Sequence, residues 1–516
     1  MIKKKLSSLR GLLLIFLSYV LFQSDHTTVG ETKSECALSL LAQLKEPRDK
    51  ADALVDIAKL FVHEGNRESA DRLLSEALIW TASIEDGLSK AAAIGAISEV
   101  GSDDQVDRAA ELANSLGGSH RAWASRQLIS AYSRLGLIDK ASDLLTEAAE
   151  ATRSAKTKNE TWYGDREFEL TLILADAARA GLTDQALKIG ASVKDKFIKG
   201  DVLRAAAIEL VEQKQYRRAL NVARSIHYEI ERIDALVEVA NAAAKSGNKS
   251  YGSEALSVAL IETRKDIFDP QQDTKTKSLV SISLGHENNG QRKEALTVLE
   301  RAEKVAHTIE KPGFKDAGMS QIALAYAGFR MFDKALQVTA NIPSPWSDVK
   351  VQTLTGIADN MIEAGERERA SSILAQAFQV AKEIDCTYFK YGISARSCFG
   401  GKAGDFIAIA STYEKAGLFE KQTEMLDLAV IQNGFKKDPP HPIIEEGSSM
   451  IGSKPVGELD IVKGYLAAGE FKKAIEVASN INGAKARVVA VAIIEFKLAK
   501  KDRSGSQTEI LSPFRC

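Results

Sequence analysis

The sequence predicts an all-α fold: a right-handed α-solenoid, or superhelix, of about eleven antiparallel helix hairpins. A short pattern of small, apolar, Gly and Ala residues recurs eleven times at nearly constant spacing. A fixed period of this length is typical of stacked helix pairs. Alanine, the residue with the highest helix propensity, is abundant throughout the chain. Hydrophobic residues make up 45% of the sequence but aromatic residues only 6%, which favours closely packed helices.

The unit Leu54–Trp80 illustrates the expected hairpin. Apolar residues at three- and four-residue spacing place one buried face on each helix. They are Leu54, Ile57, Ala58 and Phe61 on the first helix, and Ala70, Leu73, Leu74 and Ala77 on the second. Gly65 lies between them, where the chain needs a left-handed residue to end the first helix. We call this position the turn residue.

The turn residue marks each unit along the chain. It is Gly65, Gly101, Gly136, Gly181, Lys214, Gly247, Gly290, Arg330, Gly365, Gly417 and Gly469. Where the spacing lengthens, we expect insertions, which lie near 154–165, 266–277 and 433–457. The predicted array spans residues 36–499, and the polar segment 500–516 is predicted to be a flexible tail.

These motifs resemble the tetratricopeptide (TPR-like) family over roughly residues 50–500. Ile129, Tyr132, Gly136, Ala141, Leu145 and Ala148 match the family's repeat spacing. Gln422 stands where the family has alanine, and the proline that closes each family repeat is mostly absent, so the array is divergent. The resemblance implies a protein-binding or peptide-binding scaffold whose first helices line a concave surface.

Candidate partner-binding residues on that surface fall six and ten residues before the turn residues. They are Lys59, Arg126, Ser130, Arg204, Asn241, Asp359, Ser411 and Lys463, together with Ser320. Their mixed charges do not reproduce the family's repeated Lys/Asn clamp for a peptide carboxylate. An extended peptide or a helix lying along the groove is the ligand we expect, and ordinary solvated groove residues are the alternative.

The amino terminus indicates an extracytoplasmic protein. Residues 1–30 join a basic start to the apolar run Gly11–Phe22, which favours a signal peptide, with an uncleaved anchor as the alternative. We therefore expect export to the periplasm or beyond the cell. Cys386 and Cys398 are candidates for a disulfide in that compartment, and two free thiols are the alternative.

No motif in the sequence indicates catalysis. We find no HExxH or GxSxG motif and expect no metal and no cofactor. The net charge of −2, with no basic stripe, argues against nucleic acid as a partner. The sequence therefore predicts an exported, non-enzymatic scaffold that contacts a membrane only through an uncleaved amino terminus. The alternatives are an α/α-toroid carbohydrate-active enzyme and an accessory superhelical domain of a cell-wall enzyme.

Overall fold

The computed structural model describes residues 35–154, 166–264, 273–342, 348–383, 401–432, 458–481 and 484–501. Within these ranges every regular element is a helix, and the helices are numbered α2 to α25. The predicted leader 1–30 and Cys386 and Cys398 lie outside the described residues. The predicted tail 500–516 also lies outside them, except for Lys500 and Lys501, which belong to the last helix.

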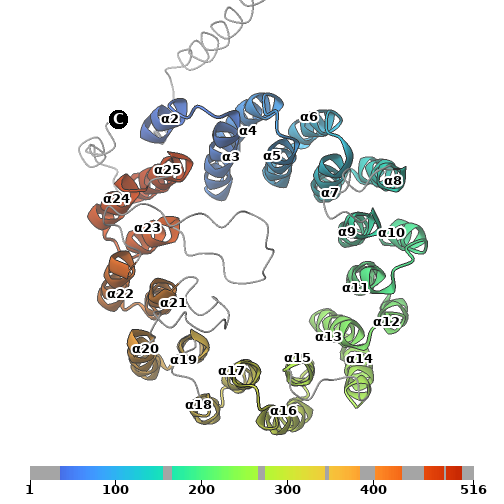
Figure 1. The fold of residues 1–516 in the computed structure, drawn as a ribbon, viewed down its shortest axis with the longest axis vertical. Helices are drawn as coiled ribbons and strands as arrows, with labels where there is room; N and C mark the ends of the chain where they lie inside the picture. Colours follow the sequence, from blue (N-terminus) through green and yellow to red (C-terminus); the bar gives the residue numbers. More distant parts are fainter. Residues whose placement is uncertain are drawn as a thin grey trace, which may run out of the picture.

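The helices form two concentric rows (Figure 1). The inner row holds the odd-numbered helices α3 (Pro47–His63), α5 (Gly87–Val100), α7 (Gly118–Arg134), α9 (Arg166–Arg179), α11 (Lys196–Glu212), α13 (Glu229–Lys245), α15 (Thr274–Asn288), α17 (Pro312–Gly328), α19 (Asp348–Glu363), α21 (Gly401–Ala416), α23 (Glu458–Ala467) and α25 (Ala484–Lys501). The outer row holds the even-numbered helices α2 (Glu35–Ala42), α4 (Arg67–Ala82), α6 (Asp103–Ala113), α8 (Ile138–Ser154), α10 (Thr183–Gly190), α12 (Tyr216–Arg224), α14 (Lys249–Glu262), α16 (Arg292–His307), α18 (Phe332–Ala340), α20 (Arg367–Glu383), α22 (Phe419–Gln432) and α24 (Phe471–Ser479).

Each inner helix pairs with the outer helix that follows it, from α3/α4 to α23/α24, so the described chain holds eleven consecutive hairpins. This confirms the predicted all-α hairpin array. The facing sides of the two rows bury a continuous hydrophobic core, which extends from Ala37 to Leu498. Small residues sit where paired helices cross, for example Ala58 and Ala70, both fully buried.

A twelfth helix pair is built from the two ends of the described chain. α25 takes an inner position and α2 the outer position beside it, and α25 also packs against α3 (Figure 1). The backbone N–H of Ala37 donates to Oε2 of the buried Glu495 at 3.2 Å. The Lys485 ammonium lies 2.7 Å from Asp52 of α3. These contacts close the array into a ring.

A predicted superhelix would be an open coil, and a closed ring is what the alternative α/α toroid implies, so the closed outline departs from the predicted shape. The curvature of a repeat array comes from the small rotation between successive units. No single motif encodes that rotation, and twelve units return the chain to its start. The ring is nevertheless made of the predicted hairpins.

The predicted turn residues have the expected left-handed backbone in ten of eleven units. Gly65 has a φ of +78°, and the two non-glycine turn residues, Lys214 and Arg330, have φ of +61° and +57°. Around Gly65 the N–H of Asn66 donates to the Phe61 carbonyl at 2.9 Å, which satisfies a carbonyl at the end of the helix. These two- and three-residue turns form one edge of the ring, the tight-turn edge.

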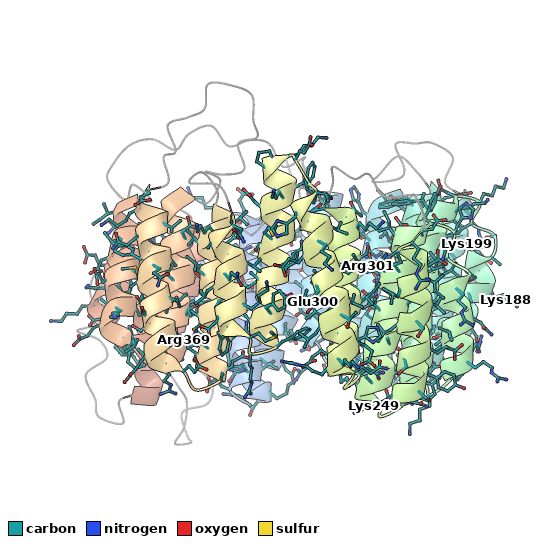
Figure 2. The ribbon with its side chains drawn as sticks, turned by 90° about the horizontal axis from the view of Figure 1, so that it is seen from below. Lys188, Lys199, Lys249, Glu300, Arg301 and Arg369 are labelled. Carbon is teal, nitrogen blue, oxygen red and sulfur yellow. The ribbon has the colours of Figure 1, made fainter. Side chains whose placement is uncertain are left out.

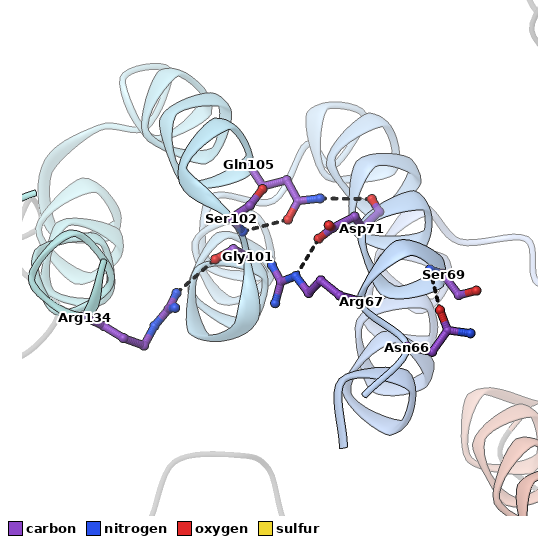
Figure 3. Close-up of polar contacts among 8 residues, drawn as sticks. All are labelled: Asn66, Arg67, Ser69, Asp71, Gly101, Ser102, Gln105 and Arg134. Atoms are coloured by element: carbon purple, nitrogen blue, oxygen red, sulfur yellow. Dashed lines mark hydrogen bonds and ion pairs between the residues drawn. The ribbon is translucent and has the colours of Figure 1, made fainter. Parts of the chain in front are cut away.

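Gly101 is the exception, with a φ of −66°. Here Arg134 of the next inner helix donates to the Gly101 carbonyl at 3.1 Å (Figure 3). It also donates to the Ser98 carbonyl at 3.0 Å. Ser102 and Gln105 form a capping box that starts α6. Glycine is needed for close approach, because a Cβ at this position would lie 2.9 Å from the Ile97 carbonyl oxygen.

The opposite edge, the long-connection edge, joins each outer helix to the next inner helix. In the side view of Figure 2, Lys249 and Arg369 lie near the lower, tight-turn edge, and Lys199 lies nearer the other edge. Connections here range from four residues to the segment 433–457. Apart from Ser154, the predicted insertions near 154–165 and 433–457 lie outside the described residues. In the predicted insertion near 266–277, α15 begins at Thr274, so residues 274–277 are helical.

Candidate binding surface of the central opening

In α3 the side that does not face the core carries a polar stripe. In α3 the residues around Leu54 and Ile57 are buried in the core, whereas Asp52, Asp56 and Lys59 are only partly buried. These three are spaced by four and three residues, which places them on one helix face. Since the outer row covers the opposite side of the inner row, this stripe belongs to the surface of the central opening (Figure 1).

Polar contacts join neighbouring inner helices at many of their junctions. The pairs are Lys485–Asp52 at 2.7 Å, Lys59–Glu99 at 2.5 Å, Arg126–Asp176 at 2.7 Å, Arg204–Glu238 at 3.3 Å, Asn288–Asn241 at 3.0 Å, Ser320–Thr353 at 2.7 Å and Lys415–Asp359 at 2.8 Å. Each joins one unit to the next. We call this set the inner ladder.

All eight predicted partner-binding residues lie on inner-row helices. Five of them, Lys59, Arg126, Arg204, Asn241 and Asp359, are members of the inner ladder. Their side chains therefore hold neighbouring units together, a role that sequence spacing alone did not indicate.

Among the described residues, the other three predicted residues make no hydrogen bond or ion pair to a neighbouring inner helix. Ser130, Ser411 and Lys463 are exposed. The Ser130 hydroxyl donates within its own helix to the Arg126 carbonyl at 3.3 Å. These positions can therefore be changed without removing a rung of the inner ladder.

Burial raises the pKa of several carboxyl groups on the inner row, including Asp56, Asp234 and Glu238. For Asp56 and Asp234 the main cause is loss of solvent, which opposes the charged form. Loss of solvent also raises the pKa of Glu238, although its partner Arg204 lowers it. These acids therefore make the charge of the central opening sensitive to pH.

A second ladder, on the outer row, was not predicted. In nine units the fourth residue after the turn residue contacts the preceding outer helix. The contacts are Gln105–Asp71, Lys140–Asp107, Gln185–Ser142, Arg218–Asp184, Tyr251–Tyr216, Lys334–Glu303, Arg369–Asp333, Lys421–Ser371 and Lys473–Asp427. Figure 3 shows the first of these. Long side chains at this fixed offset are the sequence signal that identifies it.

Three rungs of the outer ladder add a tyrosine from the inner row. Tyr132 donates to Asp107 at 3.0 Å, and the same carboxylate binds Lys140 at 2.8 Å. Tyr326 with Glu303 and Lys334, and Tyr465 with Asp427 and Lys473, repeat this arrangement. Burial and the adjacent carboxylate raise the pKa of each tyrosine, so the phenol stays protonated as a donor. We assign these clamps a structural role.

The described residues offer an open surface for binding. A cavity of about 20 Å³ between α7 and α9, lined by Trp123, Arg126 and Leu172, has room for about one water molecule. A crevice of about 240 Å³ on the outer face is lined by Tyr132 and Lys140, the two residues that bind the Asp107 carboxylate. Neither resembles the deep, largely apolar pocket that buries a small ligand.

Within the described ranges no three His, Cys, Asp or Glu side chains gather as a metal site would require. None of the helices described there combines the length and apolar character that crossing a bilayer demands.

No protein-family model and no curated protein matches the sequence. Among solved structures, the chain is similar to Ton1535 from Thermococcus onnurineus (18% identity, 64% of this chain and 99% of that one, TM-score 0.28). It is also similar to a putative kinesin light chain from Podospora anserina (15% identity, 40% of this chain and 97% of that one, TM-score 0.26). A third similar structure is a Rap protein complexed with competence and sporulation factor (12% identity, 65% of this chain and 98% of that one, TM-score 0.27). At these TM-scores the similarities establish no family membership and no function. In its hairpins and turns the chain resembles a divergent tetratricopeptide-like repeat array, as the sequence predicts.

Proposed function

We propose that this protein is an exported, non-enzymatic scaffold that binds an extended peptide or a helix of a protein partner at its central opening. The supporting observation is the inner row itself, a ring of helices (Figure 1) whose uncovered sides carry polar groups such as Asp56, Arg126 and Asn241. The inner ladder fixes the spacing of these sides, so the surface is organised before a partner arrives. Preorganisation of this kind lowers the entropy cost of binding.

The test must avoid the inner ladder, because alanine at Arg126 or Arg204 would remove an inter-unit contact together with any partner contact. A photo-crosslinking amino acid at Ser130 or Ser411 samples the central opening. The same residue at Glu300, on the outward face of α16 in Figure 2, is the matched control. We expect one polypeptide to crosslink from both inner positions and not from Glu300.

The captured polypeptide is then titrated against variants that narrow the opening. Ser130→Arg and Ser411→Arg should lower its affinity at least tenfold while leaving the thermal unfolding midpoint within a few degrees of the parent protein. Crosslinking that occurs only from Glu300, or affinity unchanged in both arginine variants, would show that the central opening is not the binding surface.

Export rests on the basic start and apolar run of the amino terminus. Leu14→Arg combined with Leu17→Arg interrupts that run, and the protein should then remain in the cytoplasmic fraction. Equal distribution of the parent and the variant between fractions would contradict the export part of the proposal.

A further inference from the structure

The outer face of the ring has a crevice between α6 and α8, and α7 forms its floor (Figure 1). α6 spans only 11 residues and ends at Ala113, whereas α4 and α8 span 16 and 17 residues. Ala110 and Ala113 line the α6 side of the crevice, and Leu144 lines the α8 side. A short outer helix with small side chains therefore leaves part of α7 uncovered.

The floor of the crevice is the side of α7 that faces away from the central opening. Arg121, Ser125, Leu128 and Tyr132 recur at spacings of four, three and four residues. This spacing places the four side chains on one face of the helix. Ser130, which faces the central opening, lies about half a turn away from them. The crevice and the central opening are therefore separate surfaces.

Both basic side chains that line the crevice are already paired with acids. At one end Arg121 donates to the amide oxygen of Asn114 at 3.1 Å and forms an ion pair with Glu147. At the other end the Lys140 ammonium lies 2.8 Å from the Asp107 carboxylate. Each positive charge of the lining is therefore balanced by a neighbouring carboxylate.

Two further acids at the crevice form no hydrogen bond or ion pair within the described part of the chain. Asp143 lines the α8 side, and Glu111 belongs to the last turn of α6. Burial raises the pKa of Tyr132, and the charges of Asp107 and Glu111 raise it further, so the Glu111 carboxylate is near the crevice. Counting the paired groups, four acids and two cations surround the crevice, which leaves a negative charge to be neutralised.

A buried hydroxyl in the floor also lacks a partner. Ser125 is 1% exposed, and its hydroxyl makes no hydrogen bond to any residue that the structure describes. Buried polar groups are normally paired, so this hydroxyl indicates that a polar group of a ligand belongs beside it. The volume of about 240 Å³ is below the roughly 300–1,000 Å³ of a small-molecule pocket, and it suits an inserted side chain.

The outer face around the crevice is acidic over a wider area. α4, α6 and α8 together carry eleven acidic and five basic residues. The outer helix α12, by contrast, carries three arginines and no acid. An acidic surface attracts cationic partners and speeds their association.

We propose that the crevice binds an arginine or lysine side chain of a basic segment in a partner polypeptide. The stem of that side chain packs on Leu128 and Leu144, its charge lies beside Glu111 and Asp143, and the Ser125 hydroxyl accepts one of its N–H groups. Arginine and lysine combine an apolar stem with a charged head, as this lining requires. Because the acidic area spans three outer helices, it favours a polypeptide with several cations over a single free amine. The site does not depend on the function proposed for the central opening.

Binding of labelled peptides to the full chain, followed by fluorescence anisotropy at low ionic strength, tests this proposal. The probes are hexa-arginine and hexa-citrulline, which has nearly the same shape without the charge. We expect hexa-arginine to bind and hexa-citrulline not to bind. Glu111→Gln/Asp143→Asn should lower the affinity for hexa-arginine about tenfold, since each exposed ion pair contributes modestly. Ala110→Leu fills the crevice without changing its charge and should lower the affinity at least about tenfold.

Two control variants separate the crevice from the rest of the surface. Glu68→Gln/Asp104→Asn removes two exposed acids of the same outer face that do not line the crevice. Its change in charge equals that of the crevice variant, but the affinity should fall less than about threefold. Ser130→Arg narrows the central opening and should bind hexa-arginine like the parent protein. Thermal unfolding confirms that every variant folds.

Absence of hexa-arginine binding, hexa-citrulline binding of equal affinity, or unchanged affinity in Ala110→Leu would each overturn the proposal. Equal losses in Glu111→Gln/Asp143→Asn and in Glu68→Gln/Asp104→Asn would also overturn it, because they would report general attraction. Loss of binding in Ser130→Arg would place the peptide in the central opening instead. If spermine binds more tightly than hexa-arginine, the crevice takes a free polyamine and the assignment to a polypeptide is wrong.

Discussion

Closure of the ring through α2 can be tested by truncating the two leucines that hold this helix in place. Leu41 of α2 and Leu44, just after it, are 6% and 5% exposed. Removing a buried leucine side chain typically costs about 2–5 kcal/mol, so Leu41→Ala with Leu44→Ala should weaken docking by about 4–10 kcal/mol. Even the lower bound shifts the docking equilibrium by about a thousandfold, since about 1.4 kcal/mol corresponds to a factor of ten.

We expect α2 to detach and the packing between α25 and α3 to loosen. The ion pair Lys485–Asp52 joins these two helices, but it is partly exposed and adds little to the stability of their contact by itself. Small-angle scattering should then report a larger maximum dimension than for the parent protein, and protease should cut near residues 43–46.

Leu73→Ala with Leu220→Ala is the matched control, since these outer-row leucines are similarly buried but lie within continuous hairpins. The control should lose comparable stability while its scattering curve stays that of a ring. If the α2 variant loses stability and its maximum dimension remains that of the parent, α2 does not hold the ring closed and our reasoning is wrong.

Three further predictions concern unfolding free energies measured in denaturant. Lys214→Gly and Arg330→Gly should each stabilise the protein by up to about 1 kcal/mol, because left-handed backbone is strained for residues other than glycine; a loss of stability would contradict this. Arg134→Ala should cost about 1–3 kcal/mol by leaving two carbonyls at the end of α5 without a donor, and Arg134→Lys should recover part of it. Burial raises the pKa of Asp234, so folding favours its protonated form and its contribution to stability falls as pH rises above about 4; Asp234→Asn should therefore be more stable than the parent at pH 7 and less dependent on pH, and parallel pH profiles would refute this.

The turn positions show how far local sequence determines this fold. The apolar spacing around Lys214 and Arg330 identified turn residues even where glycine is absent, because both neighbouring helices constrain the register. Gly101 has the same spacing but a different backbone: Arg134 of the next inner helix binds its carbonyl, and Gln105 in the first turn of α6 accepts from the Ser102 N–H. The local pattern therefore predicts the hairpin, and long-range partners decide the detailed turn.

Ring closure and the roles of the inner residues depend on relations between units, which one unit's sequence does not contain. The residue pair Ala37–Glu495 is separated by 458 positions, and nothing local to either residue indicates the other. Arg126 and Arg204 were correctly placed on the inner helices, but their acidic partners lie on the next inner helix, in registers that depend on how the units stack. Spacing within a hairpin predicts the face of a residue and not its partner.

The difference between the two edges has a consequence for engineering and divergence. Lengthening a flexible connection costs little free energy, since the closure entropy grows only with the logarithm of its length. The long-connection edge already accommodates segments as different as 225–228 and 433–457, while the inter-helix packing continues past both. A foreign domain or an affinity tag should therefore be tolerated in 433–457, whereas the same insertion beside Gly65 would break a turn whose geometry is fixed by hydrogen bonds.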